Sequence, residues 1–214
     1  MRLFTIVVFS IFILNALVQS HAGELETINE KISQGQASHL EKTSHEVLNK
    51  ADSDSMTPLM TAALDGNAKA VSLLLKKKVD LNKKNRNNDS ALSLAVGAEQ
   101  VDIAKILISA KADTSGGFGE NKESLLHSAI RTGNAEMIQL IMKQPTSAAN
   151  STDQDGNTPL MVAAEKNDAQ TITLLLKSGA DALLKNKEGK TAKDIATLWK
   201  SSKAIEALKA PKTK

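Results

Sequence analysis

Apolar residues recur along the chain in pairs of short stretches with helical spacing, and polar segments separate each pair from the next. In the clearest copy, Leu160, Ala163 and Ala164 fall on one face of a first helix, because positions three and four apart share a side. A second helix carries Ile172 and Leu175 on its apolar side. One such pair cannot bury its own apolar face, so the pattern predicts stacked pairs that cover one another.

The ends of these helices carry residue types that favour the start or the end of a helix. Thr158 is suited to cap the first helix by accepting a backbone N–H, and Pro159 follows at a position where a missing donor costs nothing. Asn167 and Asp168 turn the chain, and Gly179 supplies the left-handed residue that often ends a helix. The sequence therefore predicts a helix-turn-helix unit at this place.

The same unit recurs at a fixed period. Its copies begin at Thr57, Ser90, Ser124, Thr158 and Thr191, which are 33 or 34 residues apart. A repeat of this length is the signature of a solenoid in which each unit contacts only its neighbours.

Several runs resemble the ankyrin-repeat family. They are Thr-Pro-Leu-x-x-Ala-Ala at residues 57–63 and 158–164, Leu-Leu-Leu at 73–75 and 174–176, and Gly-Ala-Asp at 179–181. The resemblance implies an all-α solenoid of about five repeats over residues 52–209, joined by short β-hairpin fingers. By register the fingers fall at residues 52–56, 85–89, 116–123, 153–157 and 186–190.

The chain departs from the family pattern in several places. The family's histidine, which ties successive fingers together, survives only as His127, and Met60, Ser93 and Met161 replace it elsewhere. We therefore expect some bonding between fingers to be lost. Glu99 stands where Gly66 turns the first repeat, and residues 115–119 lengthen the third finger, so the stack is expected to be distorted there.

The N-terminal residues have a different pattern. Arg2 precedes an apolar stretch at residues 3–18, and Ser20 and Ala22 supply small residues for cleavage, so residues 1–22 are predicted to be a signal peptide cleaved after Ala22. The expected location is the periplasm, without stable membrane insertion after cleavage. Residues 23–51 are predicted to be a degenerate capping repeat, and residues 210–214 a basic tail.

Composition narrows the function. The formal net charge of +3 falls by one when Arg2 is removed with the leader, which is too weak to favour nucleic acid as a partner. Cysteine is absent, which excludes disulfides and thiol catalysis. Only 2% of the residues are aromatic, which favours close-packed helices over a sheet.

No catalytic, metal or cofactor site is predicted. Ser124 and His127 could form a nucleophile pair on one helical turn, but a capping serine and a structural histidine are favoured. Asp153, Asp155 and Asn157 resemble the start of a calcium loop, but the twelfth position lacks the required glutamate, so a turn at the finger tip is favoured. The protein is therefore not expected to be an enzyme.

Members of the ankyrin family usually hold partners with the finger tips and the exposed side of the first helices. The positions that map there by register are Asp54, Met56, Leu64, Asp65, Arg86, Asn87, Asp89, Phe118, Glu120, Asn121, Arg131, Gln154, Asp155, Asn157, Glu165, Lys166, Lys187 and Trp199. Phe118 is either an exposed anchor or a filler of a groove between repeats. Trp199 is either an anchor or a lid on the last repeat's core.

The leading hypothesis is a periplasmic protein that binds and masks an envelope enzyme. The chain looks like exported ankyrin proteins that protect a bacterium from its own peptidoglycan hydrolases. Two alternatives stay open: support of a periplasmic catalase in peroxide resistance, and a secreted effector that binds a host protein. A monomer is expected because both ends look capped. Whether the basic run at residues 76–86 is plain solvated surface or binds an acidic partner is left open.

Overall fold

The computed structural model describes residues 23–145 and 149–209. The predicted signal peptide, residues 1–22, and the predicted basic tail, residues 210–214, lie outside the described residues. Within them, no helix has the length and apolar character needed to span a membrane.

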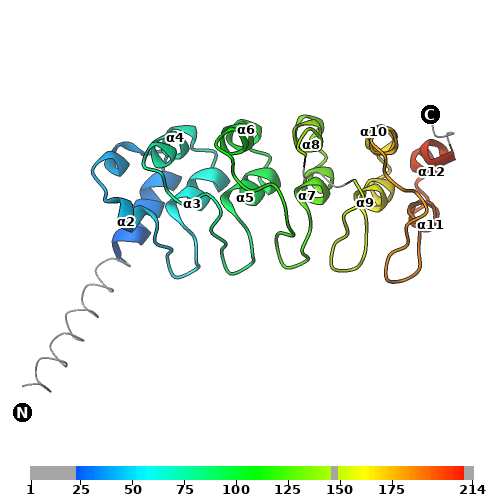
Figure 1. Ribbon diagram of the computed structural model, residues 1–214, viewed down its shortest axis with the longest axis horizontal. Helices are drawn as coiled ribbons and strands as arrows, with labels where there is room; N and C mark the ends of the chain where they lie inside the picture. The colour runs from blue at the N-terminus through cyan, green and yellow to red at the C-terminus, as the bar shows by residue number, and fades with distance from the viewer. Residues whose placement is uncertain (1–22, 146–148, 210–214) are drawn as a thin grey trace, which may run out of the picture.

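The described residues form five helix pairs in a row (Figure 1). The first helix of each pair lies in an inner layer beside the fingers, and these helices are α3 (Pro58–Leu64), α5 (Ala91–Gly97), α7 (Leu125–Thr132), α9 (Pro159–Glu165) and α11 (Ala192–Leu198). The second helices form an outer layer and are α4 (Ala68–Lys76), α6 (Val101–Ser109), α8 (Ala135–Met142), α10 (Ala169–Lys177) and α12 (Ser202–Lys209). The predicted all-α solenoid is confirmed.

Each inner helix begins with the same capping arrangement. The side chain of the residue before the helix accepts a bond from the backbone N–H three residues on, and the side chain there accepts the backbone N–H of the capping residue. The five capping residues are Thr57, Ser90, Ser124, Thr158 and Thr191. The period seen in the sequence is therefore a period of helix starts.

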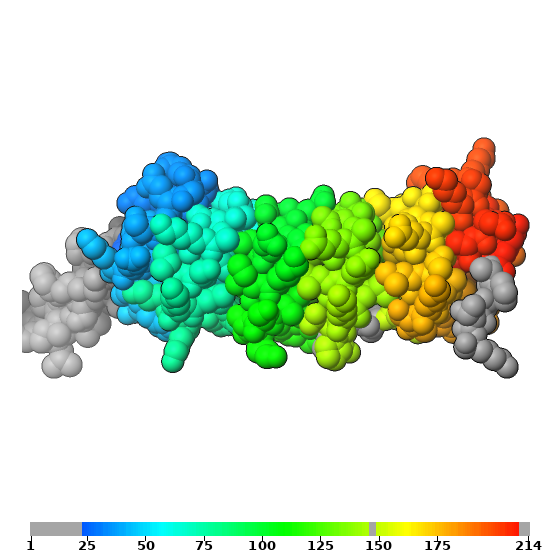
Figure 2. Space-filling model, turned by 90° about the horizontal axis from the view of Figure 1, so that it is seen from above, coloured from blue at the N-terminus to red at the C-terminus, as the bar shows by residue number. Residues whose placement is uncertain are grey.

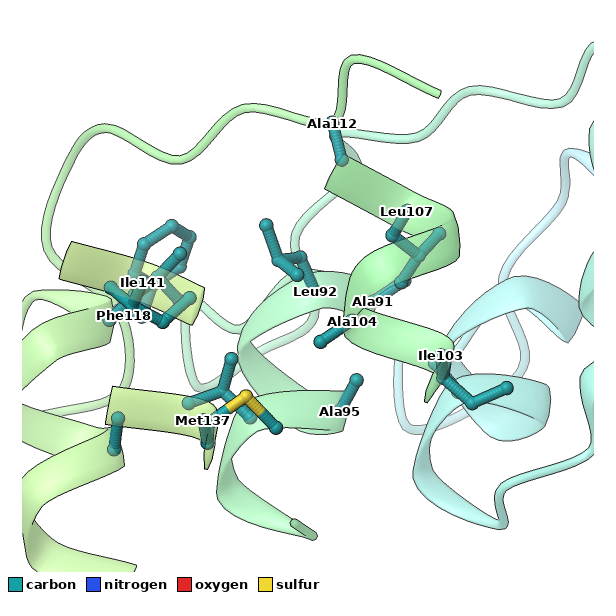
Figure 3. Packing of buried hydrophobic residues seen from close by; sticks show 14 of the residues in the cluster. Ala91, Leu92, Ala95, Ile103, Ala104, Leu107, Ala112, Phe118, Met137 and Ile141 are labelled. Carbon is teal, nitrogen blue, oxygen red and sulfur yellow. The ribbon is translucent and has the colours of Figure 1, made fainter. Parts of the chain in front are cut away.

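The core is one continuous cluster that runs through the stack. Each inner helix packs against the next, and small side chains such as Ala62, Ala95 and Ala163 are fully buried between them. Figure 3 shows this packing around Ala95, Leu92 and their neighbours. In Figure 2 the colours follow one another in bands along the long axis, as expected when each repeat contacts only its neighbours.

The N-terminal part covers the first repeat with irregular structure. It consists of a helical stretch at residues 23–33, the 3-10 helix η1 (Ser38–Glu41) and α2 (His45–Leu48). Leu25, Ile28 and Ile32 are buried, as their spacing predicted.

The turns between inner and outer helices are alike in all repeats. Gly66 and Gly133 adopt a left-handed backbone, and so do Glu99 and Asn167, both with a φ of 58°, and Lys200 with a φ of 55°. The prediction that Glu99 distorts the stack is wrong, because Glu99 takes up the conformation that glycine adopts elsewhere.

Four of the five fingers close in the same way. The side-chain oxygen of the first finger residue accepts backbone N–H groups two and four residues on, and the residues concerned are Asp52, Asn85, Asp153 and Asn186. At the equivalent place the third finger has Gly119, and it closes instead through paired backbone bonds between Phe118 and Glu123. The expected irregularity is therefore confined to the finger.

Candidate protein-binding surface

The fingers and the inner helices together line two hollows on one side of the stack. The first, here called the acidic hollow, has a volume of about 300 Å³ and is lined by Asp89, Ser93, Phe118, Gly119, Glu120, Asn121, Glu123, Ser124, Leu125, Ser128 and Arg131. The second, here called the C-terminal hollow, has a volume of about 340 Å³ and is lined by Arg131, Asp155, Asn157, Met161, Val162, Glu165, Asn186, Lys187, Glu188, Lys190, Ile195, Leu198 and Trp199. Arg131 lines both hollows, so they adjoin.

Arg131, the residue that lines both hollows, forms an ion pair with Glu123. Arg131, on α7, donates to the carboxylate of Glu123 at 2.5 Å, and the Glu123 side chain is only 14% exposed. A half-buried pair of this kind is screened less by solvent than a fully exposed one. It fixes the guanidinium at the boundary between the two hollows.

Most of the predicted binding residues are exposed on this side. Those that line a hollow are Asp89, Phe118, Glu120, Asn121, Arg131, Asp155, Asn157, Glu165, Lys187 and Trp199. Those that line neither are Asp54, Met56, Leu64, Asp65, Arg86, Asn87, Gln154 and Lys166. The structure thus gathers ten of the eighteen positions around two adjoining hollows over repeats 2 to 5.

Phe118 is not an exposed anchor. Its side chain is 5% exposed and belongs to the same buried cluster as Leu92, Leu107 and Ile141 (Figure 3). The Lys84 ammonium lies 3.6 Å from the centre of its ring. Of the two interpretations, groove filling is the one that the structure shows, because the backbone bonds with Glu123 fold the loop inward.

Trp199 is not a lid on the last core. It follows α11 as the C-cap residue and is 60% exposed, beside Leu198, which is 62% exposed. The core under the last repeat is covered instead by α12, where Ala204 is fully buried. The anchor interpretation of Trp199 therefore fits the structure, and that of Phe118 does not.

Ser124 and His127 form a structural unit. His127 is fully buried, and its Nε2 lies 2.9 Å from the Asn157 carbonyl oxygen, which only accepts, so Nε2 carries the proton. Nδ1 then accepts from the Ser124 hydroxyl at 2.7 Å. Burial lowers the pKa of His127, mainly because it penalises the charged ring. The histidine thus caps its own helix and ties it to the next finger.

The other residues at the histidine position bond within their own repeats. Met60 and Met161 accept the N–H of the capping residue through sulfur at 3.4 Å, and the Ser93 hydroxyl donates to Asp89. Neighbouring fingers are joined by other bonds, such as that from the Lys187 N–H to the Asp155 carbonyl and that from the Gln154 N–H to the Asn121 carbonyl. Loss of the histidine removes one type of tie between fingers and leaves the others.

The basic run at residues 76–86 is largely engaged within the molecule. Lys77 donates to the carbonyl of Glu41, and Lys83 to that of Asn49, both in the N-terminal part. Arg86 lies 3.9 Å from Asp54 in the preceding finger. Part of the basic run therefore joins the first repeats to the N-terminal part, and this part of the run is neither a purely solvated surface nor a site for an acidic partner.

A family model described as "Ankyrin repeats (3 copies)" matches residues 18–116 and 126–213. The chain belongs to the ankyrin-repeat family. The interval between the two matches, residues 117–125, covers most of the third finger and the start of α7, and the closing bonds of this finger differ from those of the other fingers.

Two relatives are each matched over less than two thirds of their own length. The nuclear factor NF-kappa-B p105 subunit of Gallus gallus is 30% identical over 146 residues, covering 66% of this chain but 15% of p105. The probable 26S proteasome regulatory subunit p28 of Saccharomyces cerevisiae is 32% identical over 148 residues, covering 68% of this chain and 64% of p28.

One chain of a solved structure is similar to the present chain over nearly its whole length. That structure is of the predatory endopeptidase Bd0816 of Bdellovibrio bacteriovorus in complex with the immunity protein Bd3460. The matched chain is 35% identical, with a TM-score of 0.75, and the alignment covers 85% of the present chain and 95% of that one.

Two residues that line the hollows, Leu198 and Glu123, were not predicted from the sequence, although the repeat register points to them. Leu198 is the register equivalent of Leu64 and Glu165, which are predicted binding residues, and Glu123 is the equivalent of Met56 and Asn157, which are predicted too. Applying the register once more to every repeat would have found both.

Among residues 23–145 and 149–209, no group of three or more histidines or carboxylates is placed to hold a metal ion.

Proposed function

We propose that the mature protein binds an exported peptidase and blocks its active site, and that it protects the producing cell from its own wall-cutting enzyme. The observation that carries this proposal is the likeness to the structure of the immunity protein complex, which covers 95% of the matched chain at 35% identity. At that level of likeness the fold is shared, which supports the proposal that the kind of partner is shared too.

The surface described above supports the same proposal. Adjoining hollows across several repeats offer a long, rigid surface that a projecting edge of another protein can enter. Because the inner helices and fingers are already fixed by caps and bonds, little conformational entropy is lost on binding. When the bound edge borders the active-site cleft of the peptidase, the rest of the stack lies over that cleft and excludes the substrate.

Export is a part of the proposal that rests on the leader-like residues 1–22. Fractionation of the native organism should place the protein in the periplasm, and sequencing of its N-terminus should start at Gly23. A cytoplasmic protein that begins at Met1 would contradict this part alone.

Inhibition is tested with the mature chain, residues 23–214, and the exported peptidoglycan peptidases encoded by the same genome. Each peptidase is incubated with purified peptidoglycan, and muropeptide release is measured as the mature chain is added. We expect one peptidase to lose its activity at about equimolar inhibitor and to co-elute with it in gel filtration. Full activity of all of them at a large excess of the chain would refute the proposal.

A further inference from the structure

The two hollows differ in charge. The acidic hollow holds the carboxylates of Asp89, Glu120 and Glu123 against the single guanidinium of Arg131. Glu123 already binds that guanidinium, and neither Asp89 nor Glu120 takes part in an ion pair of the described residues. Asp89 accepts a bond from the Ser93 hydroxyl, and the Lys84 ammonium over the Phe118 ring lies near enough to attract it. With Lys84 counted beside Arg131, two cations face three carboxylates, and one negative charge, with Glu120 free of any ion pair of the described residues, remains to favour a cationic group.

The geometry of the acidic hollow suits a side chain that is both apolar and charged. Phe118 and Leu125 contribute apolar atoms to its wall, while Glu120 is exposed at the finger. Lysine and arginine side chains bury their methylene groups along apolar surface and keep the charged end beside polar groups. A lysine or arginine side chain fits both features of this hollow.

The C-terminal hollow has balanced charge and an apolar edge. Three cationic side chains and three carboxylates line it, and one pair of them, Lys190 and Glu188, is bonded at 2.7 Å. Leu198 and Trp199 stand exposed at its side. Exposed neighbouring tryptophan and leucine side chains are typical of protein interfaces, where tryptophan often contributes a large share of the binding energy.

The spacing of the two hollows sets the length of what can occupy both. The acidic hollow lies over repeats 2 and 3 and the C-terminal hollow over repeats 4 and 5, so their centres are two repeats apart. Packed helices lie about 10 Å apart, which gives roughly 20 Å for two repeats. An extended chain covers this distance in about six residues.

We propose that this surface binds one extended segment of a partner protein that carries a lysine or arginine and, about six residues away, an aromatic or large aliphatic residue. The cationic side chain enters the acidic hollow beside Asp89 and Glu120, and the apolar side chain packs against Leu198 and Trp199. The inference rests on the proposed function and specifies the part of the peptidase that the inhibitor holds.

A phage library of random twelve-residue peptides tests the proposal without knowledge of the partner. The library is selected against the immobilised mature protein at about 0.15 M salt. We expect enriched peptides to carry a lysine or arginine and an aromatic or large aliphatic residue about six positions apart. Enrichment of acidic peptides, of peptides without this spacing, or of no peptide at all would overturn the proposal.

Four variants of the protein locate the two contacts. A synthetic copy of the most enriched peptide should bind about tenfold more weakly to Glu120→Gln and to Trp199→Ala, the size of effect typical of an important interface residue. Glu26→Gln, an exposed glutamate in the N-terminal helical stretch at residues 23–33, and Leu183→Ala, another exposed apolar residue, are the matched controls and should bind as the parent does. Equal binding by all four variants would contradict the assignment of the hollows.

Salt dependence separates the two contacts further. Raising the salt concentration should weaken the peptide's binding to the parent protein, because the cationic contact is electrostatic. Binding to Glu120→Gln should change less with salt, while Trp199→Ala should keep the salt dependence of the parent. The reverse result would contradict the placement of the cationic residue.

The inhibition assay distinguishes failure of this inference from failure of the proposed function. If a peptidase is inhibited equally by the parent, Glu120→Gln and Trp199→Ala, the function holds and the two-contact surface is wrong. If the selected peptides behave as expected but no peptidase is inhibited, the surface holds and the function is wrong.

Discussion

His127 bonds to two repeats through its two ring nitrogens, and its protonation therefore affects a junction of the stack. The ring is neutral in the native protein, because burial lowers its pKa below the ordinary value near 6.5. Below that value the unfolded chain binds a proton that the native protein does not. The contribution of the neutral His127 ring to the free energy of unfolding is therefore fully present above about pH 6.5. It is lost as the pH falls toward the pKa of His127 in the native protein, by at most about 1.4 kcal/mol per pH unit.

The substitution His127→Met tests this, since methionine stands at the same position in the first and fourth repeats. We expect urea unfolding at pH 7.5 to show a loss of about 1–3 kcal/mol, because the Asn157 carbonyl loses its bond. Between pH 7.5 and 5 the stability of the variant should fall less than that of the parent. His39, whose pKa is also lowered by burial and by Lys31, leaves some slope in both proteins. Equal slopes would show that His127 does not titrate differently on unfolding.

Among the elements, the helix pairs could be predicted from the sequence and the path of the third finger could not. The helix pairs followed from short-range signals such as Thr158, Pro159 and the alanines, since capping and close packing depend on residue type at fixed spacing. The third finger did not follow. Gly119 replaces the Asp or Asn whose side chain closes the other fingers, so the loop's path, and with it the burial of Phe118, depends on bonds that no local pattern encodes.

The turn between α5 and α6 offers a stability test that involves the backbone alone. Glu99 is left-handed there with a φ of 58°, which costs a non-glycine residue about 1 kcal/mol. We expect Glu99→Gly to be more stable than Glu99→Ala by about that amount in urea unfolding, because both variants lose the side chain and its bond from Asn134. The converse control is Gly133→Ala at the equivalent turn. A methyl group there meets no atom within 4 Å, so the expected loss of about 1 kcal/mol is a backbone effect. Equal stability of the two Glu99 variants would contradict the strain.

At the scale of the whole molecule, the two layers are not equally tight at the junction of repeats 3 and 4. The inner layer is held by packing of α7 on α9, by His127 with Asn157, and by the bond between Gln154 and Asn121. In the outer layer an open groove of about 240 Å³ lies between α8 and α10. In a solenoid, stability is close to a sum of repeat and junction contributions, so we expect this junction to couple its two repeats more weakly than the others do.

Filling the outer groove should therefore stabilise the whole protein. Gln139 lines the groove on α8 and faces an opening that also includes Ile138 and Leu174. Gln139→Leu should raise the free energy of unfolding by about 0.5–1 kcal/mol, since the added apolar area is removed from water against an existing apolar wall. Ser72→Leu at the equivalent position of α4, which does not line this groove, should gain less. Because the inner surface is untouched, peptide and peptidase binding should stay at the level of the parent. If both substitutions change stability by the same amount, the gain reflects helix propensity, and the groove is not the weak point of the stack.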